Sequence, residues 1–305
     1  MRARVILSAL CGVLIASQSL AAQDRYIDAD GVRLRYIDQG TGEPVLLVHG
    51  FGNSLETWTN SGVVQALATS YRVIAFDERG HGRSDKPHDP RSYGREMTND
   101  IVRVLDQLGI DRAHIVGYSL GGHLVSQLLT LHPERFLSAT LIAGAGRLSW
   151  DSVQARDAEV EAAEVERDCI SRTLLFRLTP PTARPSDDSL KTMSARCLAD
   201  STQDRFALAA ITRSRADQVI APTAVAAVRV PTLAIVGSSD PMRAALEELA
   251  GLRPSVKLVV VDGATHAGAR GVLRRPETIA ALREFLARAS RTSRVAPMRP
   301  GPAKG

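Results

Sequence analysis

The stretch Gly117-Tyr118-Ser119-Leu120-Gly121 has the form G-x-S-x-G and says more about architecture than any other part of the sequence. It directly follows the apolar run 113–116 and directly precedes residues 122–131, which favour a helix. At a sharp strand-to-helix turn, a serine is held with strained backbone angles and its hydroxyl projects from the end of the sheet. Glycines two positions before and after the serine suit so tight a turn. This context predicts that Ser119 is a nucleophile.

Short apolar runs recur on both sides of this turn. Most are bounded by Gly, Asp or Pro, and β-branched residues are common in them. Their apolarity is continuous rather than alternating, which indicates strands buried on both faces and therefore a mainly parallel sheet. The predicted strands are residues 45–48, 73–76, 113–116, 139–143, 232–236 and 257–261.

Helix-like stretches alternate with these strands. Ahead of the first strand, residues 25–29 and 32–38 flank Asp30-Gly31, a pair typical of a hairpin turn. Alternation of strands and helices predicts an α/β fold with a doubly wound, mainly parallel sheet. The predicted helices are residues 97–108, 122–131, 243–249 and 276–289.

The alternation stops over residues 147–228. This segment is rich in Ala, Arg, Glu and Asp, is broken at Pro180-Pro181, and has no convincing strand run. We interpret it as a helical cap inserted after the sixth strand and lying over the site. The alternative is a series of helices packed beside the sheet. The predicted α/β core then comprises residues 22–146 and 229–289.

The two ends of the sequence have compositions unlike the core. A basic start, an apolar stretch shorter than the roughly 20 residues of a membrane span, and small residues before Ala22 predict a secretory signal peptide over residues 1–21. We therefore expect a secreted or periplasmic protein without a stable membrane anchor. Residues 290–305 contain Pro, Gly and basic residues, and we expect a disordered tail there.

The formal net charge of +5 does not predict a nucleic-acid partner. Arg2 and Arg4 would leave with the signal peptide, and the sequence after Ala287 adds several basic residues and no acid. The remaining body is therefore slightly negative. Its ordinary proportions of hydrophobic (44%) and charged (23%) residues exclude a disordered chain.

Removal of the signal peptide would leave two cysteines, Cys169 and Cys197. In an oxidising compartment they could form a disulfide, and otherwise they would be two buried thiols. The sequence does not choose between these alternatives. No Cys/His spacing suggests zinc, and we expect neither a metal nor a cofactor.

A serine hydroxyl needs a base to remove its proton, and the base needs a group that orients it. Asp240 follows the predicted strand 232–236, and His266 follows the predicted strand 257–261. Both residues lie in loops past the carboxyl ends of strands, where a parallel sheet gathers its site. We predict a catalytic triad of Ser119, Asp240 and His266, with Asp262 as the alternative acid.

A third component is predicted in His49-Gly50-Phe51-Gly52, which follows the strand 45–48. Its glycines let backbone N–H groups approach a substrate closely. The backbone amides of Phe51 and Leu120 are the expected donors of an oxyanion hole, which stabilises the charge that develops on a carbonyl oxygen.

These motifs together resemble the α/β-hydrolase superfamily over roughly residues 26–289, outside the cap. Residues 77–85, Asp-Glu-Arg-Gly-His-Gly-Arg-Ser-Asp, are also similar to a segment common in that family. In relatives this segment is structural, so the resemblance leaves Asp77 and His81 out of the catalytic set. It implies that His49 orients its loop, and we expect His123 to be a packed neighbour of the nucleophile.

Serine at the turn separates this sequence from haloalkane dehalogenases and epoxide hydrolases, which use aspartate there. The resemblance then implies attack by Ser119 on an ester, thioester or lactone of a small-molecule acyl substrate. A secreted carboxylesterase or lipase-like hydrolase is the leading hypothesis. An acyltransferase and a carbon–carbon bond hydrolase would use the same residues, and a ligand receptor on this fold is the non-enzymatic alternative. Charges in the cap nearly cancel, so the sequence predicts neither the charge nor the size of the substrate.

Overall fold

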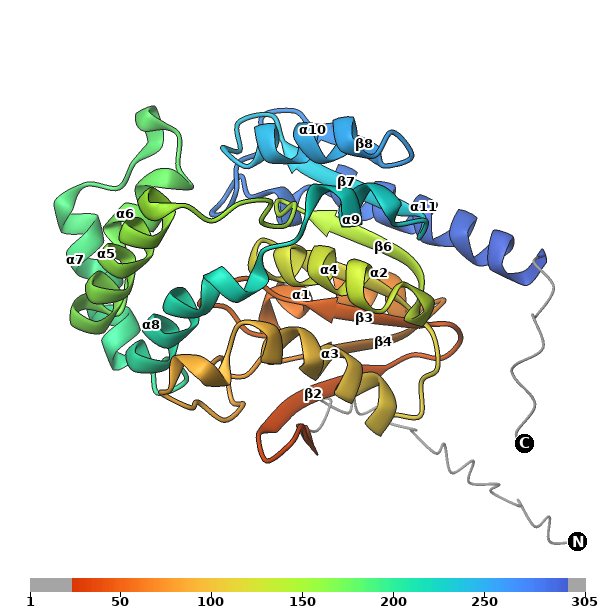
Figure 1. Cartoon of the computed structure of the whole chain (residues 1–305), viewed down its shortest axis with the longest axis horizontal. Helices are drawn as coiled ribbons and strands as arrows, with labels where there is room; N and C mark the ends of the chain where they lie inside the picture. Colours follow the sequence, from red (N-terminus) through yellow and green to blue (C-terminus); the bar gives the residue numbers. More distant parts are fainter. Residues whose placement is uncertain (1–23, 296–305) are drawn as a thin grey trace, which may run out of the picture.

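The computed structural model describes residues 24–295 (Figure 1). The predicted signal peptide lies outside the described residues. Within residues 24–295, no helix combines the length and the apolarity that crossing a membrane requires.

The centre of the molecule is an eight-stranded sheet of order β1-β2-β4-β3-β5-β6-β7-β8. β1 and β2 pair antiparallel with each other, β2 pairs antiparallel with β4, and all the other pairs are parallel. All six strands predicted for the parallel sheet are present, and the predicted doubly wound fold is confirmed. The strands are β1 (Arg25–Asp28), β2 (Arg33–Gln39), β3 (Pro44–Val48), β4 (Arg72–Phe76), β5 (Ala113–Tyr118), β6 (Phe136–Ile142), β7 (Thr232–Gly237) and β8 (Lys257–Val261).

The predicted hairpin joins β1 to β2 through a two-residue loop. Asp30 and Gly31 have positive φ angles of 59° and 79°. The Ala29 N–H donates to the Val32 carbonyl oxygen at 2.8 Å and closes the turn. Two successive positive φ angles are what a type I′ turn requires, and this turn matches the twist of the two strands.

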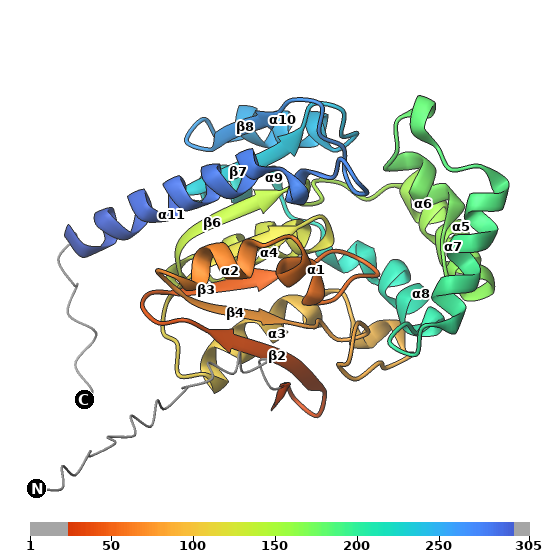
Figure 2. The ribbon, with the colours of Figure 1, turned by 180° about the vertical axis from the view of Figure 1, so that it is seen from behind.

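Helices cover both faces of the sheet and complete two hydrophobic cores. α3, α4, α9 and α10 lie on the face seen in Figure 1, and α1, α2 and α11 lie on the opposite face, seen in Figure 2. Because both faces are covered, β5 and β7 are buried at every residue. These helices are α1 (Glu56–Asn60), α2 (Val63–Ala68), α3 (Arg95–Gln107), α4 (Leu120–Leu131), α9 (Pro222–Ala227), α10 (Arg243–Leu252) and α11 (Pro276–Val295).

A group of helices between β6 and α9 stands at one end of the sheet, as the green segments of Figure 1 show. α5 begins with a capping box, in which Asp151 accepts from the Val153 and Gln154 N–H groups while the Gln154 side chain accepts from the Asp151 N–H. α9 packs against α4, so the last residues of the segment 147–228 lie against the sheet body. The helices of this cap are α5 (Ser152–Asp168), α6 (Arg172–Arg177), α7 (Asp187–Ala199) and α8 (Arg205–Arg213), followed by the 3₁₀ turn η4 (Ser214–Gln218).

The expected disordered tail over residues 290–305 is wrong for its first six residues. α11 continues to Val295 rather than ending at residue 289. Ser290 is 8% exposed, and its hydroxyl lies 3.2 Å from His114 Nε2 on β5, which anchors this end of the helix to the sheet. Arg288 also pairs with Glu284 one turn earlier. The rest of the predicted tail, residues 296–305, lies outside the described residues.

Candidate active site

Ser119 occupies the turn between β5 and α4 with φ 53° and ψ −112°. Such angles are strained for a residue with a side chain. Gly117 and Gly121, two positions before and after the serine, have no side chain and so let neighbouring backbone segments pack closely around the turn. A Cβ on Gly117 would lie 2.3 Å from the Gly121 carbonyl oxygen, and a Cβ on Gly121 would lie 2.2 Å from that of Val48. Both distances are shorter than any real contact, so the G-x-S-x-G spacing is a steric requirement of this turn.

The structure brings Ser119, His266 and Asp240 into one line. Ser119 Oγ lies 3.0 Å from His266 Nε2, and His266 Nδ1 lies 3.1 Å from each carboxylate oxygen of Asp240. The imidazole therefore carries its proton on Nδ1, where it donates to the carboxylate, and Nε2 accepts from the serine hydroxyl. The Met242 N–H donates to Asp240 Oδ1 at 2.9 Å and helps to fix the carboxylate.

Two of the three side chains are buried. The side chains of His266 and Asp240 are 6% and 0% exposed, whereas Ser119 keeps partial access to solvent. Asp262, the alternative acid, is exposed and accepts from the Ser238 hydroxyl at 3.3 Å instead. The geometry therefore selects Asp240 as the partner of the histidine.

The loop that holds Phe51 lies directly beside Ser119. A Cβ on Gly50 would lie 3.2 Å from the Ser119 Cβ. Within residues 24–295, the Phe51 N–H has no hydrogen-bond acceptor, and the Leu120 N–H is at the first position of α4, where helical N–H groups have no partner inside the helix. Both predicted donors are therefore available to a ligand next to the serine.

His49 and Asp77 act on the backbone around the site. The His49 Nδ1–H donates to the Gly50 carbonyl oxygen at 2.8 Å, and Nε2 accepts from the Glu78 N–H at 3.1 Å. Asp77 accepts from the N–H groups of Leu55 (2.7 Å) and Arg83 (2.8 Å). The structure thus gives both residues the loop-shaping role that the resemblance implied.

One buried group has ligand types that could bind a metal: His49, Glu78 and His81 offer atoms within 4.8 Å of one another. His49 uses both ring nitrogens for backbone hydrogen bonds, so it has no nitrogen left for an ion. Burial and the nearby Asp100 and Asp77 raise the pKa of Glu78 well above its ordinary value, which favours a neutral carboxyl. This group therefore does not fit a metal centre.

Two cavities meet at Ser119 and Phe51. The first, of about 490 Å³, also contains His266 and runs to the disulfide between Cys169 and Cys197; we call it the apolar arm. Its other apolar lining comes from the cap: Ile170, Leu174, Leu175, Leu178, Met193 and Leu208.

The second cavity, of about 290 Å³, is lined by Ser119, Leu120, His123, Arg147, Arg177 and Arg215. We call it the basic arm. These three arginines were not predicted from the sequence, because they lie on separate segments of a region whose charges nearly balance. The one local signal is that Arg147 has no acidic residue within three positions in the sequence.

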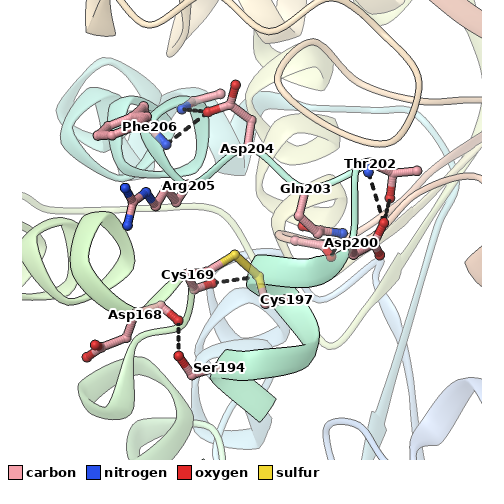
Figure 3. The surroundings of a disulfide bond; sticks show 12 residues. Asp168, Cys169, Ser194, Cys197, Asp200, Thr202, Gln203, Asp204, Arg205 and Phe206 are labelled. Atoms are coloured by element: carbon pink, nitrogen blue, oxygen red, sulfur yellow. Dashed lines mark hydrogen bonds between the residues drawn. A yellow bond between two sulfur atoms is a disulfide. The ribbon is translucent and has the colours of Figure 1, made fainter. Parts of the chain in front are cut away.

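The disulfide left open by the sequence is present. Cys169 and Cys197 are joined, with their Cα atoms 5.8 Å apart, and connect the end of α5 to α7 (Figure 3). The Ser194 hydroxyl donates to the Asp168 carbonyl oxygen at 2.6 Å beside it. This cross-link fixes two cap helices at the wall of the apolar arm.

Residues 43–269 match the family model described as alpha/beta hydrolase fold. The chain belongs to this family. The resemblance inferred from the motifs is therefore confirmed.

Curated relatives match this chain over part of its length. It is 39% identical over 133 residues to the dihydrolipoyllysine-residue acetyltransferase component of the acetoin cleaving system of Cupriavidus necator, a match that covers 42% of this chain and 34% of that protein. It is 40% identical over 133 residues to the 2-hydroxymuconate semialdehyde hydrolase of Pseudomonas sp., covering 43% and 47%. The chain therefore spans less than half the length of these curated relatives.

The fold matches over a much larger share. A thermophilic esterase from Thermogutta terrifontis superimposes with a TM-score of 0.70 and 24% identity, covering 88% of this chain and 99% of that one. At this identity the likeness shows a shared fold, and chemistry has to be argued from the site.

Proposed function

We propose that this protein is a serine hydrolase that cleaves a carboxylic ester, lactone or thioester of a small molecule through an acyl-enzyme on Ser119. The observation that carries the proposal is the line from Ser119 Oγ through His266 to Asp240, with hydrogen-bond distances of 3.0 and 3.1 Å. A hydroxyl, an imidazole and a carboxylate in this order form the arrangement that activates a serine.

The first half of the reaction follows from this geometry. His266 Nε2 takes the hydroxyl proton as Ser119 Oγ attacks the carbonyl carbon. The N–H groups of Phe51 and Leu120 donate to the oxyanion that forms, a contribution of several kcal/mol in such sites. His266 then gives its proton to the leaving alcohol oxygen, the bond between carbonyl carbon and that oxygen breaks, and the acyl group stays on the serine.

The second half repeats these steps with water as the nucleophile. His266 removes a proton from the water, whose oxygen attacks the acyl carbon, and the Ser119 oxygen leaves with that proton. Asp240 accepts from Nδ1–H throughout and stabilises the imidazolium. Every step uses groups of this chain, the substrate and water.

A fluorophosphonate probe and an ester panel test this function. We expect the probe to label wild type on Ser119, and we expect the Ser119→Ala variant to lose labelling and about 10⁴-fold or more of kcat. Absence of labelling and of turnover on esters, lactones and thioesters, together with tight binding of a small ligand, would favour a receptor instead.

Two related reactions are distinguished in the same assays. An acyltransferase would give more transfer product than free acid when an alcohol or thiol acceptor is added. A carbon–carbon bond hydrolase would prefer a vinylogous diketone to an ester.

Export by a signal peptide is also part of the proposal. The disulfide between Cys169 and Cys197 supports it, since disulfides persist mainly in oxidising compartments. Sequencing the N-terminus of the protein recovered from a secretion-competent host tests it. A start at Ala22 in the extracytoplasmic fraction is the expected result, and an intact Met1 in the cytoplasm would contradict it.

A further inference from the structure

Three arginines from separate parts of the chain converge on the basic arm. Arg147 lies in the loop after β6, Arg177 at the end of α6, and Arg215 in η4. The Arg147 carbonyl oxygen accepts from the Ile220 N–H at 2.9 Å, which fixes the backbone at this position. All three line the same cavity as Ser119, so their charges act within the space that opens on the reactive hydroxyl.

The carboxylates around these three arginines do not balance their positive charge. Glu161 on α5, which is 1% exposed, accepts from Arg177 at 2.7 Å and also from Arg215. One carboxylate therefore serves two guanidinium groups. Within residues 24–295, no carboxylate pairs with Arg147, whose Nε donates only to the Gln218 amide oxygen at 3.4 Å. Glu248 also lines the cavity, but its side chain is exposed and its charge is screened by solvent.

The pKa of Arg147 reflects this excess of positive charge. Burial, together with the positive charges of Arg215 and Arg177, lowers the pKa of Arg147 to about 9. A cation under such conditions is stabilised by any anion that enters the cavity. After Glu161 is counted, two of the three positive charges remain, so a carboxylate that enters the cavity finds an unbalanced guanidinium group.

His123 adds a neutral donor to the same cavity. The Gly146 N–H donates to His123 Nδ1 at 3.1 Å, so the ring carries its proton on Nε2. Burial and Arg147 hold the pKa of His123 well below its ordinary value, which keeps the ring uncharged. It therefore adds a hydrogen-bond donor without an additional charge.

The position of His266 says which half of an ester enters each arm. The leaving oxygen must lie near His266, because this residue protonates it. His266 lines the apolar arm, so the alcohol part extends there. The basic arm contains Ser119, Phe51 and Leu120 without His266, which places the acyl part in it.

We propose that the basic arm binds a carboxylate carried by the acyl group, so that the preferred substrates are half-esters of dicarboxylic acids. This inference rests on the proposed function. In the reaction, water adds to the carbonyl carbon, the ester C–O bond breaks, and the products are the dicarboxylate, the alcohol and one proton. Arg147 is the main recognition group, and Arg177 and Arg215 support it.

Three methyl esters and two acetate esters test the proposal in a pH-stat. Monomethyl glutarate carries the anion on the acyl side, methyl pentanoate and dimethyl glutarate are neutral counterparts, and 4-acetoxybutyrate carries the anion on the alcohol side. We expect kcat/KM for monomethyl glutarate to exceed that of the neutral esters by about tenfold or more, the scale of a charged hydrogen bond. 4-Acetoxybutyrate should gain no such advantage over butyl acetate.

The Arg147→Gln variant should reduce the ratio of kcat/KM for monomethyl glutarate to that for methyl pentanoate by about tenfold. Arg91→Gln is the matched control: Arg91 is 91% exposed, pairs with Asp89 outside both arms, and should leave this ratio unchanged. Circular dichroism and a thermal melt establish that each variant is folded. An equal ratio in wild type and Arg147→Gln, or no preference for the anionic ester in wild type, would overturn the proposal.

Binding separates this inference from the proposed function. We expect calorimetry with the Ser119→Ala variant to detect glutarate and to show about tenfold weaker binding when Arg147→Gln is added. Glutarate binding without ester turnover in wild type would contradict the proposed hydrolase function and support the anion site. Turnover of neutral esters without any preference for, or binding of, the dicarboxylate would do the reverse.

Discussion

The phenol of Tyr118 donates a hydrogen bond of 2.7 Å to the backbone carbonyl oxygen of His266, and its ring stacks against the imidazole with centroids 5.6 Å apart. The residue before the nucleophile therefore positions the base that serves it. Burial raises the pKa of Tyr118, so the phenol remains a donor across the working pH range. One side chain thus couples the serine turn to the loop after β8.

A Tyr118→Phe variant tests this coupling, since it keeps the ring and removes the donor. We expect a loss of about 1 kcal/mol in the free energy of unfolding. Because the His266 loop gains freedom, kcat should fall severalfold while KM changes little. Urea denaturation and ester kinetics measure the two effects.

Tyr93→Phe is the control for this prediction. The Tyr93 hydroxyl donates to the Pro87 carbonyl oxygen, so this variant also loses a hydrogen bond from a buried tyrosine. It should lose stability and keep its kcat. Equal kcat losses in the two variants would show that Tyr118 acts only through general stability.

A second constraint on the nucleophile comes from Gly144, which follows β6. A Cβ at this position would lie 2.2 Å from the Ser119 carbonyl oxygen. We expect Gly144→Ala to cost about 1–3 kcal/mol of stability by overpacking. Displacement of Ser119 should also lower kcat by about 10²-fold, the cost of a shift of roughly 1 Å in a reacting group.

Gly251→Ala is the matched control, because Gly251 lies in α10 with nothing within 4 Å of the added Cβ. This variant should gain roughly 0.5–1 kcal/mol from helix propensity and keep full activity. If Gly144→Ala retained the kcat of wild type, the backbone contact with Ser119 would not matter for catalysis.

The strands and the triad line could be predicted because both depend on local pattern. A run such as residues 232–236 is apolar without interruption, and chain order then places Asp240 and His266 at the same sheet edge. The short helices α1 and α2 were not predicted, since five or six residues carry too little periodicity.

The cap could not be predicted in the same detail. The sequence indicates helices there, but the meeting of Arg147, Arg177 and Arg215 depends on the path of the chain between them. The same holds for the disulfide, because spacing along the chain does not fix the distance between Cys169 and Cys197. Similarly, the continuation of α11 past residue 289 is accompanied by the contact between Ser290 and His114, which no local pattern encodes.

The buried carboxyl of Glu78 predicts a pH dependence of stability. Its pKa is raised well above 4.5 by burial and by Asp100 and Asp77, and within the described chain neither of its side-chain oxygens has a hydrogen-bond partner. Above pH 4.5 the unfolded chain therefore releases a proton that the native state retains. Native stability falls as pH rises through this range, by up to about 1.4 kcal/mol per pH unit, until the folded-state pKa is passed.

Glu78→Gln removes this titration and keeps the shape of the side chain. Relative to wild type, the variant should be similar in stability at pH 4 and increasingly more stable at pH 6 and pH 8. Urea denaturation at the three pH values measures the difference, and titrations shared by both proteins cancel. A difference that stays constant with pH would mean that Glu78 is not buried in its neutral form.

The disulfide between Cys169 and Cys197 should stabilise the cap and shape the apolar arm. Both sulfur-bearing residues line that arm, and the bond closes a loop between α5 and α7 (Figure 3). Loop-closure entropy puts its contribution at roughly 3 kcal/mol. We expect reduction of the disulfide in wild type to lower the melting temperature. It should also raise KM for esters with long alcohol parts more than KM for methyl esters, because a long alcohol part reaches the disulfide at the wall of the apolar arm.

The double variant Cys169→Ala/Cys197→Ala provides the control for the reductant. It should resemble reduced wild type in melting temperature and in the KM ratio of long to methyl esters, and the reductant should leave it unchanged. Thiol titration must first establish that both sulfurs of wild type are free after reduction. If fully reduced wild type kept its original melting temperature and KM ratio, the disulfide would not be needed to shape the apolar arm. Packing of α5 on α8 would then be sufficient to hold the cap helices in place.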